Sequence, residues 1–296
     1  MLILKTSFSQ NQIKAALRKM AFRNGRLKCP HCGYFKVRSI EKRYYCLRCR
    51  KKFSLSSNTW LKNIKLPLKT FIALLECWLT GRSVKDAAES LEVSRPTIYR
   101  YYQLFRLNVA KTVDFKPEND VQVDETYFGQ FKRQANWYHG FMKYKVIDKT
   151  GVAGISCPST GQLRTIIIEG RPGKFINDFI QRNVPTNIPI YSDASFIYRY
   201  LYRKGYRHLS MSHDRGFDYS YYIESCWSWM KRRLFKQYHH FTRKYAKDYV
   251  QELTWHFNTR KDIKNPLKTL SELTCPVPDT LHDPWPSIPD HQKRWS

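Results

Sequence analysis

The chain has 296 residues, and its 52 Lys and Arg against 24 Asp and Glu give a formal net charge of +28 at pH 7. Hydrophobic residues make up 42% and aromatic residues 15% of the sequence, so the composition excludes a disordered chain or a mere basic tail. We expect a folded, intracellular protein of two or three domains that binds a polyanion. No stretch approaches the about 18 uncharged apolar residues of a membrane span, and residues 1–4 are too short for a secretory signal.

The positive charge is concentrated near the N-terminus. Residues 1–60 contain 15 Lys and Arg and one acid, Glu41, which accounts for +14, half of the total excess. A field of one sign and this density disfavours a compact chain unless an anion relieves it. Nucleic acid phosphate is the expected partner, and neutralising it with Lys and Arg makes binding strongly dependent on salt.

The first expected elements are a short amphipathic helix over residues 11–20 and a zinc ribbon behind it. Four cysteines form two Cys-x-x-Cys pairs separated by 13 residues, and four thiolates at this spacing close a tetrahedral structural Zn²⁺ site. The alternative, two disulfides or redox dithiols, is disfavoured without a secretory signal. The predicted zinc ligands are Cys29, Cys32, Cys46 and Cys49, and the predicted phosphate contacts beside them are Lys51 and Lys52.

Three helices are expected next, in a helix-turn-helix arrangement. Pro67 begins the first helix and Gly81 ends it, Ser83 caps the second, and Ser94 caps the third. The polar face of the third helix offers Arg95, Thr97 and Arg100 to a major groove. Three-helix bundles that do not bind DNA share this pattern, but the adjacent basic segment favours DNA binding.

From Asp120 onward the hydrophobic pattern changes to that of strands, with Gly151 and Gly161 expected in turns. The expected strands cover residues 121–128, 139–147, 162–168 and 188–192, and the expected helical segments cover residues 173–181, 196–203 and 222–257, the last broken near residues 238–240. Three meander strands, then alternating strands and helices, then C-terminal helices predict a mixed α/β layer of ribonuclease H type.

Three acids fall where such a sheet brings them together. Asp124 is in the first strand, Asp193 ends the fourth, and Glu224 begins the first C-terminal helix. Clustered carboxylates repel one another unless divalent cations bind them. Hard oxygen ligands suit Mg²⁺ or Mn²⁺, and two such ions can catalyse in-line phosphoryl transfer. Neighbouring Glu125 is expected on the opposite face of the sheet.

Several motifs occur together in one order over roughly residues 10–260. They are Arg23-Asn24-Gly25, Cys29-Pro30-x-Cys32-Gly33, the second cysteine pair, the three helices, Val123-Asp124-Glu125-Thr126-Tyr127, Tyr191-Ser192-Asp193, Gly205-Tyr206-x-His208 and Ile223-Glu224-Ser225-x-Trp227-Ser228-x-x-Lys231-Arg232. In this order the chain resembles the zinc-ribbon DDE transposases of bacterial insertion sequences, relatives of eukaryotic Merlin elements. Tyr238-His239-His240 and Asn258-Thr259-Arg260 also resemble family positions, without an assigned chemistry.

The resemblance implies a ribonuclease H-like catalytic domain in which Asp124, Asp193 and Glu224 bind the metal ions. It also implies that Lys231, on the same helix face as Glu224, contacts DNA near the cut, with Arg232 and Arg233 beside it. The sequence departs from many relatives at Tyr219-Ser220-Tyr221 and at Ala194-Ser195, where His-Thr-Asn and Gly-Trp are commoner. Asp214 and Asp218 are therefore kept as alternatives to Glu224.

The sequence thus predicts a DNA transposase that binds terminal inverted repeats, cuts at the transposon ends and joins the 3′-OH to target DNA. Two ends joined in one event require a homodimer or a larger synaptic complex. The alternatives are a regulator that binds DNA without cutting it and a metal-dependent nuclease without strand transfer. The expected location is the cytoplasm, with the nucleoid, in a bacterium and the nucleus in a eukaryote.

Four regions follow from these patterns. Residues 1–60 form the N-terminal helix and zinc ribbon, residues 61–112 the helix-turn-helix domain, residues 113–265 the catalytic domain, and residues 266–296 a Pro-rich tail. Because the tail is rich in proline and nearly neutral, we expect an extended arm there and not a domain.

Overall fold

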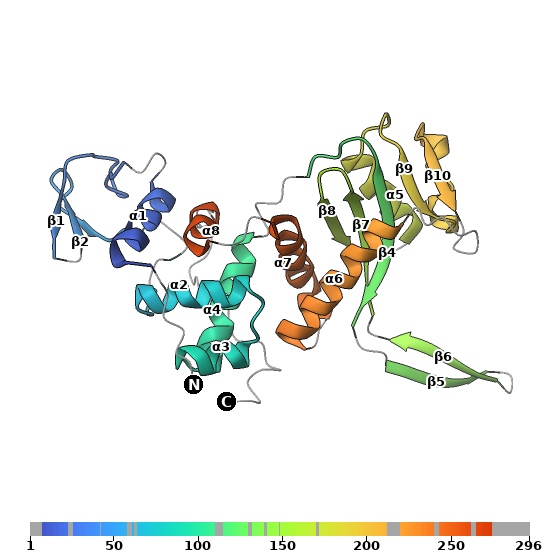
Figure 1. Ribbon diagram of the computed structural model, residues 1–296, viewed down its shortest axis with the longest axis horizontal. Coiled ribbons are helices and arrows are strands. Elements are labelled where there is room, and N and C mark those ends of the chain that lie inside the picture. The colour runs from blue at the N-terminus through green and yellow to red at the C-terminus, as the bar shows by residue number, and fades with distance from the viewer. Residues whose placement is uncertain are drawn as a thin grey trace. The chain divides into compact units, whose positions relative to one another are not determined.

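The computed structural model describes residues 8–22, 26–41, 43–57, 61, 64–109, 115–129, 132–138, 141–147, 149–169, 172–211, 220–239, 243–261 and 265–273. The chain divides into two compact units, one formed by residues 1–112 with 261–296 and the other by residues 113–260 (Figure 1). Within the part described, no helix has both the length and the apolar character needed to cross a membrane.

The first unit begins with the expected amphipathic helix, α1 (Gln10–Ala21). The Ser9 hydroxyl accepts a hydrogen bond from the Gln12 N–H at 3.3 Å, and the Gln12 side chain accepts one from the Ser9 N–H at 2.8 Å. This reciprocal pair satisfies two free donors and fixes the helix start. A small antiparallel sheet follows, made of β1 (Val37–Ile40), β2 (Arg43–Cys46) and β3 (Lys52–Phe53).

Three helices come next, close to the expected bounds: α2 (Leu68–Leu79), α3 (Val84–Leu91) and α4 (Arg95–Val109). The Ser83 hydroxyl accepts from the Asp86 N–H at 3.1 Å, which confirms the predicted cap of α3. Large rings fill the space between α2 and α4, with Trp78 and Phe105 centroids 5.4 Å apart and Phe71 and Phe105 centroids 5.7 Å apart. These buried rings fix the position of α4.

The C-terminal segment differs from the expected extended arm over its first seven residues. Residues 266–272 form helix α8 (Pro266–Glu272), which contacts α1 and α2 within the first unit. The Asn265 side chain caps this helix, and Leu270 and Leu273 are buried. Apolar residues spaced for a helix therefore outweigh the proline content at this point. Residues 274–296 lie outside the described residues.

The second unit is built on one five-stranded mixed sheet, which confirms the predicted mixed α/β architecture (Figure 1). Its strand order is β10-β9-β4-β7-β8, in which β4, β7 and β8 are antiparallel neighbours and β9 and β10 run parallel to β4. The strands are β4 (Val121–Phe128), β7 (Thr150–Cys157), β8 (Gln162–Ile167), β9 (Ile190–Asp193) and β10 (His208–Met211). The helical elements are α5 (Pro172–Asn183), α6 (Tyr221–Tyr238), α7 (Ala246–Thr259) and the short 3-10 helices η2 (Phe196–Tyr198), η3 (Tyr202–Lys204) and η5 (Arg243–Tyr245).

The two faces of the sheet belong to different hydrophobic clusters. Val121 and Val123 of β4 pack with α5 and with Tyr198 of η2. Phe128 of the same strand packs with α6 and α7 on the other face. Because side chains alternate along a strand, Asp124 lies on the α6 face and Glu125 on the η2 face. This confirms that the two neighbouring acids point to opposite sides of the sheet.

The expected strand over residues 139–147 was only partly correct. The structure has two strands in this region, β5 (Lys132–Tyr138) and β6 (Phe141–Ile147), which pair only with each other and form a hairpin outside the five-stranded sheet. The second strand of that sheet is β7, which was not predicted from the sequence. Gly151, expected in a turn, pairs with Tyr127 inside the sheet. A glycine in a buried strand is indistinguishable from a turn signal by pattern alone.

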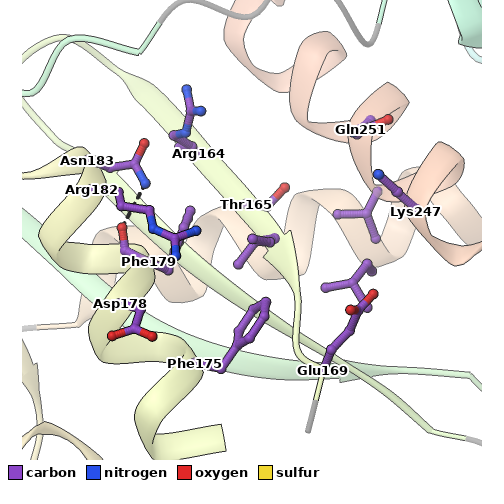
Figure 2. Close-up of a pocket in the computed structure, with 13 residues that line it drawn as sticks. Arg164, Thr165, Glu169, Phe175, Asp178, Phe179, Arg182, Asn183, Lys247 and Gln251 are labelled. Atoms are coloured by element: carbon purple, nitrogen blue, oxygen red, sulfur yellow. Dashed lines mark hydrogen bonds between the residues drawn. The ribbon is translucent and has the colours of Figure 1, made fainter.

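The free edge of β8 is partly covered by the side chain of Asn258 from α7. The Leu163 N–H donates to Asn258 Oδ1 at 2.7 Å, and Asn258 Nδ2 donates to the Leu163 carbonyl at 2.8 Å. Arg260 donates to the carbonyls of Gly161 and Phe257. These two positions of the Asn258-Thr259-Arg260 motif therefore hold α7 to the sheet. Further along the same edge, Figure 2 shows a cavity of about 580 Å³ between β8, α5 and α7.

Replacing Asn258 by alanine is expected to lower the free energy of unfolding by about 1–3 kcal/mol, because one donor and one acceptor of Leu163 lose their partner. Urea denaturation of the purified protein measures this change. Asn187→Ala, at an exposed position, is the matched control and should leave the midpoint unchanged. Equal midpoints for Asn258→Ala and the unsubstituted protein would show that Asn258 does not secure the edge.

Candidate functional site

Asp124 and Asp193 are brought together by the parallel pairing of β4 with β9. The strand register joins Val121 to Ile190 and Gln122 to Tyr191, and continuing it by two residues places Asp193 beside Asp124. The charge of Asp193 contributes to a raised pKa of Asp124. Asp193 at the carboxyl end of β9 thus meets Asp124, which lies midway along β4 and is far from it in sequence.

Asp124 is half-buried and contacts Trp227 of α6. Trp227 Nε1 donates a hydrogen bond to Asp124 Oδ2 at 2.9 Å. Burial is the main reason that the pKa of Asp124 rises to about 7, the negative charges of Glu125 and Asp193 add to the rise, and the Trp227 hydrogen bond opposes it. Such a carboxylate is fully ionised at neutral pH only when a cation joins it.

The close approach of Trp227 depends on Gly154, the residue opposite Asp124 in β7. A Cβ atom at position 154 would lie 2.5 Å from the Trp227 ring. Real atoms do not approach so closely, so any side chain here would displace the ring. Gly154 therefore lets the indole reach over the sheet to Asp124.

Glu224 lies in the first turn of α6 and is half-buried. The start of this helix is tied to β4, because the Gln122 side-chain carbonyl accepts from the N–H groups of Tyr222 at 2.9 Å and Ile223 at 3.1 Å. The Ser220 hydroxyl donates to Glu224 Oε1 at 2.8 Å. Glu224 is thus carried by a helix that is bonded to the strand of Asp124.

Asp124 and Asp193 are neighbours, whereas Glu224 is linked to β4 through the hydrogen bonds of Gln122 with the start of α6. Among the described residues, the only group of three or more Asp, Glu, His or Cys side chains with ligand atoms all within 4.8 Å is formed by cysteines. Asp214 and Asp218, the alternatives to Glu224, lie outside the described residues, as does the Arg23-Asn24-Gly25 motif. Oxygen ligands on adjacent elements, held apart by like charge, suit hard divalent cations.

Glu125 serves the opposite face of the sheet. The buried Tyr198 hydroxyl donates to Glu125 Oε2 at 2.5 Å. Burial raises the pKa of Glu125, and the charge of Asp193 raises it further. This bond ties η2 to the residue next to Asp124.

Ser192 and His208 support the end of β9. The Ser192 hydroxyl and His208 Nε2 are 2.8 Å apart, and the Ser192 hydroxyl also donates to the Asp193 carbonyl. Burial lowers the pKa of His208, which Asp193 partly offsets. His208 therefore helps to fix the backbone that carries Asp193.

The basic residues of α6 have different environments. The ammonium group of Lys231 interacts with the charge of Asp124 and lies 5.9 Å from the centre of the Phe128 ring, so it is on the side of α6 that faces β4. Arg232 is exposed. Arg233 is half-buried, with its guanidinium 5.6 Å from the Trp229 ring centre and 3.1 Å from His256 Nε2. Arg232 is therefore freer than Arg233 to meet DNA.

The residues predicted to read DNA lie at the start of α4. Arg95 and Arg100 are exposed, and Thr97 is half-buried with its hydroxyl 2.9 Å from that of Ser94. Arg95 also makes a surface ion pair with Glu89 at 3.7 Å, which contributes little to stability. All three side chains belong to the first two turns of one helix.

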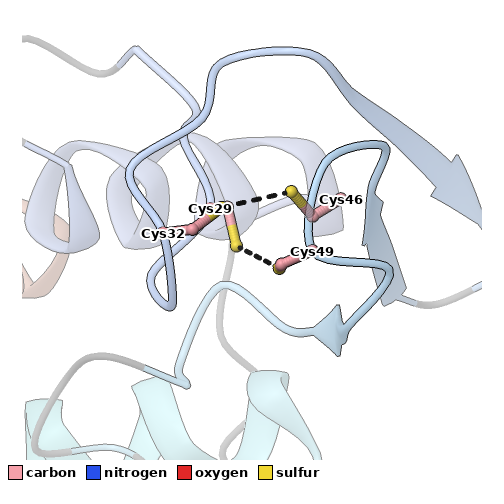
Figure 3. A group of neighbouring side chains, drawn as sticks. All are labelled: Cys29, Cys32, Cys46 and Cys49. Carbon is pink, nitrogen blue, oxygen red and sulfur yellow. Dashed lines mark hydrogen bonds between the residues drawn. The ribbon is translucent and has the colours of Figure 1, made fainter.

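The four cysteines predicted to bind zinc converge at one point of the first unit (Figure 3). Their sulfur atoms lie within 4.8 Å of one another, with Cys29 and Cys49 at 3.6 Å and Cys32 and Cys46 at 3.5 Å. Zn–S bonds of about 2.3 Å in a tetrahedron require sulfur atoms about 3.8 Å apart. The arrangement therefore fits a four-coordinate Zn²⁺ ion.

The backbone around the cysteines supports metal binding. Gly33 and Arg50, which follow the two pairs, both have positive φ angles, and their N–H groups donate to the carbonyls of Cys29 and Cys46. Burial raises the pKa of Cys29 to about 11. Burial opposes ionisation of Cys46 as well, but backbone hydrogen bonds from Cys49 and Arg48 bring its pKa to about 7. A cation is needed to keep all four thiolates ionised. Lys51 and Lys52 are exposed beside the second pair.

Four residues of this site were not identified from the sequence: Gln122, Gly154, Ser220 and Trp227. Each acts by contacting a distant residue, so no periodic pattern reveals it. Trp227 belongs to the motif after Glu224, which gave its position but not its role. Gln122 is one of several polar residues in β4, so the sequence pattern does not mark it, although the structure shows that its side chain is buried.

Comparison with known proteins finds a family model and a solved structure that are similar to this chain. Residues 117–258 match the family model described as the ISXO2-like transposase domain. The solved structure titled "Mos1 transposase paired-end complex with left transposon end" is similar at 15% sequence identity, over 71% of this chain and 79% of that chain, with a TM-score of 0.29. No curated protein matches the chain. The segment that matches this family model contains Asp124, Asp193 and Glu224.

Proposed function

We propose that this protein is a DNA transposase that binds the terminal inverted repeats of its element, cuts at the transposon ends and joins the freed 3′-OH to target DNA. The observation that carries the proposal is the pair Asp124 and Asp193, adjacent on parallel strands within a transposase domain. An antiparallel meander of three strands followed by two parallel strands supports a ribonuclease H-like fold for this domain.

Asp124, Asp193 and Glu224 would hold two Mg²⁺ or Mn²⁺ ions. When bound, these ions activate the attacking oxygen and stabilise the leaving oxygen of an in-line phosphoryl displacement. Trp227 orients Asp124, and the Ser220 hydroxyl orients Glu224. Lys231, on the same side of α6, contacts the phosphate of the strand being cut.

DNA recognition would be divided between the elements of the first unit. Helices α3 and α4 form a helix-turn-helix in which Arg95, Thr97 and Arg100 reach base edges in the major groove. The ribbon holds structural Zn²⁺ and grips phosphate through Lys51 and Lys52. Arg232 adds a phosphate contact in the second unit, and Arg233 supports it by packing. The high density of cations makes the affinity for DNA fall steeply with salt.

Joining two equivalent ends in one event requires two copies of the active site. The working assembly is therefore a homodimer or a larger synaptic complex, isologous if the ends are equivalent. The protein acts where its DNA is, in the cytoplasm with the nucleoid in a bacterium and in the nucleus in a eukaryote.

The test is incubation of the protein with Mg²⁺, end-containing DNA and a target plasmid. A joined product at the target supports the transposase. Cut DNA without a joined product would mean a nuclease, and binding without cutting would mean a regulator; either result rejects strand transfer. Both alternatives share the DNA-binding elements, so only the products distinguish them.

Trp227→Phe is expected to weaken Mg²⁺ binding and lower the cutting rate by about 10–100-fold, the usual effect of removing a hydrogen bond to a metal ligand. The phenyl ring keeps the packing over Gly154 and loses the N–H that orients Asp124. A cleavage assay with titrated Mg²⁺ measures the effect.

Trp229→Phe is the matched control, because Trp229 lies on the same helix and packs on Phe257 without contacting the acids. It should cut at the normal rate. Equal activity of the Trp227 and Trp229 variants would show that the indole does not position Asp124.

A further inference from the structure

The segment that directly follows Asp193 exposes a group of aromatic rings and arginines. Within this aromatic–arginine segment, residues 196–204, Phe196, Tyr200 and Tyr202 are 63%, 48% and 61% exposed. The Arg199 guanidinium is 4.8 Å from the Phe196 ring centre, and that of Arg203 is 5.4 Å from Tyr200 and 5.7 Å from Tyr202. Three large aromatic rings are exposed here, and each has an arginine guanidinium group near it. Such a patch indicates a surface that binds another molecule.

A cavity of about 630 Å³ lies between this segment and the N-terminal half of α5. The rings of Phe196 and Tyr200 line one side of it and meet edge to face, with centroids 6.4 Å apart. The other polar lining residues are Lys174, Asn177, Asp178, Gln181 and Lys204, which are two cations and one acid among them. Its volume is in the range of pockets that bind nucleotide-sized ligands. Lys174 and Lys204 contribute two ammonium groups to its lining.

Asn177 lines this cavity and joins α5 to the aromatic–arginine segment. Its Nδ2 donates to the carbonyls of Gly173 at 2.6 Å and Ile197 at 3.1 Å, which fixes the orientation of the amide. Its Oδ1 is buried and is not exposed to a ligand. Asn177 therefore holds the two walls of the cavity together.

The segment is bonded to the acidic site at two points. The Ser195 N–H donates to Asp193 Oδ1 at 3.1 Å, and the Tyr198 hydroxyl donates to Glu125, the neighbour of Asp124. Phe196 and Tyr200 flank Tyr198 and are exposed where Tyr198 is buried. The segment therefore begins directly after Asp193, and its bond to Glu125 lies on the face of the sheet opposite Asp124.

We propose that the cavity between α5 and the aromatic–arginine segment binds an unpaired nucleobase of the DNA strand that passes the catalytic acids. The proposal rests on the proposed function as a DNA-cutting enzyme. Stacking on aromatic rings next to Arg is how proteins hold single-stranded bases, and it tolerates any sequence. A paired base offers no free face to such rings. The segment holds three cations and no acid, which favours nucleic acid over a protein partner.

The test uses the full-length, zinc-loaded protein without Mg²⁺, so that no cutting occurs. Two probes are bound at one fixed salt concentration: a dT oligonucleotide containing a single 2-aminopurine, and a duplex of the same length. The double variant Phe196→Ala/Tyr200→Ala is expected to bind the single strand at least about tenfold more weakly, with the duplex nearly unchanged. The 2-aminopurine fluorescence, quenched by stacking in the unsubstituted protein, should stay bright.

Phe235→Ala is the matched control, because Phe235 is 69% exposed in the same unit but lies on α6. It should leave both affinities unchanged. Tyr200→Phe keeps the ring and should keep the single-strand affinity, which excludes a general loss of folding as the cause.

Unchanged single-strand affinity and unchanged quenching in the double variant would overturn the proposal. An equal loss for single strand and duplex would overturn it as well, because the segment would then grip phosphate only. A change of oligomeric state without DNA, with affinities unchanged, would assign the rings to a protein contact instead. Cutting of end DNA by the unsubstituted protein, measured separately, decides the proposed function independently of these outcomes.

Discussion

Asp124→Ala and Asp193→Ala are each expected to abolish Mg²⁺-dependent cutting of transposon-end DNA while leaving binding of that DNA intact. The two side chains are neighbours, Asp124 midway along β4 and Asp193 at the end of β9, and each would supply oxygen ligands to the ions. The loss should exceed the about 10–100-fold effect expected for Trp227→Phe, because a ligand itself is removed. Gel assays of cut product and of bound DNA separate the two properties.

Glu169→Ala is the control for this pair, since Glu169 is an exposed acid in the same unit outside the site. It should cut normally. Cutting that persists in both Asp124→Ala and Asp193→Ala would show that the active site lies elsewhere.

Asp124→Asn provides a second measurement that does not depend on activity. The pKa of Asp124 in the folded protein, about 7, lies above its ordinary value, because burial disfavours the ion. At a pH above the pKa of an unfolded aspartate, the unfolded chain loses this proton before the folded chain does. The Asp124 carboxyl group therefore lowers the free energy of unfolding progressively as the pH rises towards 7. The metal-free asparagine variant should therefore have a higher Tm than the unsubstituted protein at pH 8 and not at pH 3. Equal Tm values at pH 8 would contradict the burial of a free carboxylate at this position.

The second large effect is expected from zinc. Cys46→Ser should remove one bound Zn²⁺ ion per chain and unfold the ribbon, because the metal site supplies much of the folding energy of such small elements. The apolar core around the cysteines contains few other fully buried side chains, among them Phe22 and Phe53. Metal analysis and thermal unfolding with and without a chelator measure both changes.

Cys77→Ala is the matched control, since Cys77 is a buried cysteine of α2 outside the cluster. It should keep full zinc content. Loss of the ribbon should also weaken DNA binding and reduce its dependence on salt, because the phosphate contacts of Lys51 and Lys52 are lost. Purified protein without zinc, and with a Tm unaffected by chelator, would reject the metal site.

Much of the first unit was predictable because its signals are local. Cysteine spacing predicted the four residues that converge into one cluster, and the side chain of Ser83 predicted the start of α3 within one residue. In the second unit the alternation of β4 placed Asp124 and Glu125 on opposite faces, as the structure has them. These inferences need only a few neighbouring residues, since caps, pairs and alternation are set by short-range backbone geometry.

The predictions failed where local signals compete. Gly151 was expected in a turn, but it lies in β7. A glycine beside a strand-like pattern is compatible with a turn and with a strand, so the pattern does not decide between them. Residues 266–272 were expected in an extended arm and form α8, because contacts with α1 and α2 outweigh proline content.

The sequence by itself determined the candidate residues for the chemistry: the four cysteines and the carboxylates Asp124, Asp193 and Glu224 stand out by type and spacing. The tertiary structure alone decided what surrounds them. Trp227 reaches Asp124 only because Gly154 leaves room, and Asn258 covers Leu163 across 95 positions of sequence. The exposed rings beside Asp193 gather around Asn177 in the same way. Such contacts depend on strand register and helix packing, which join distant segments and leave no periodic trace along the chain.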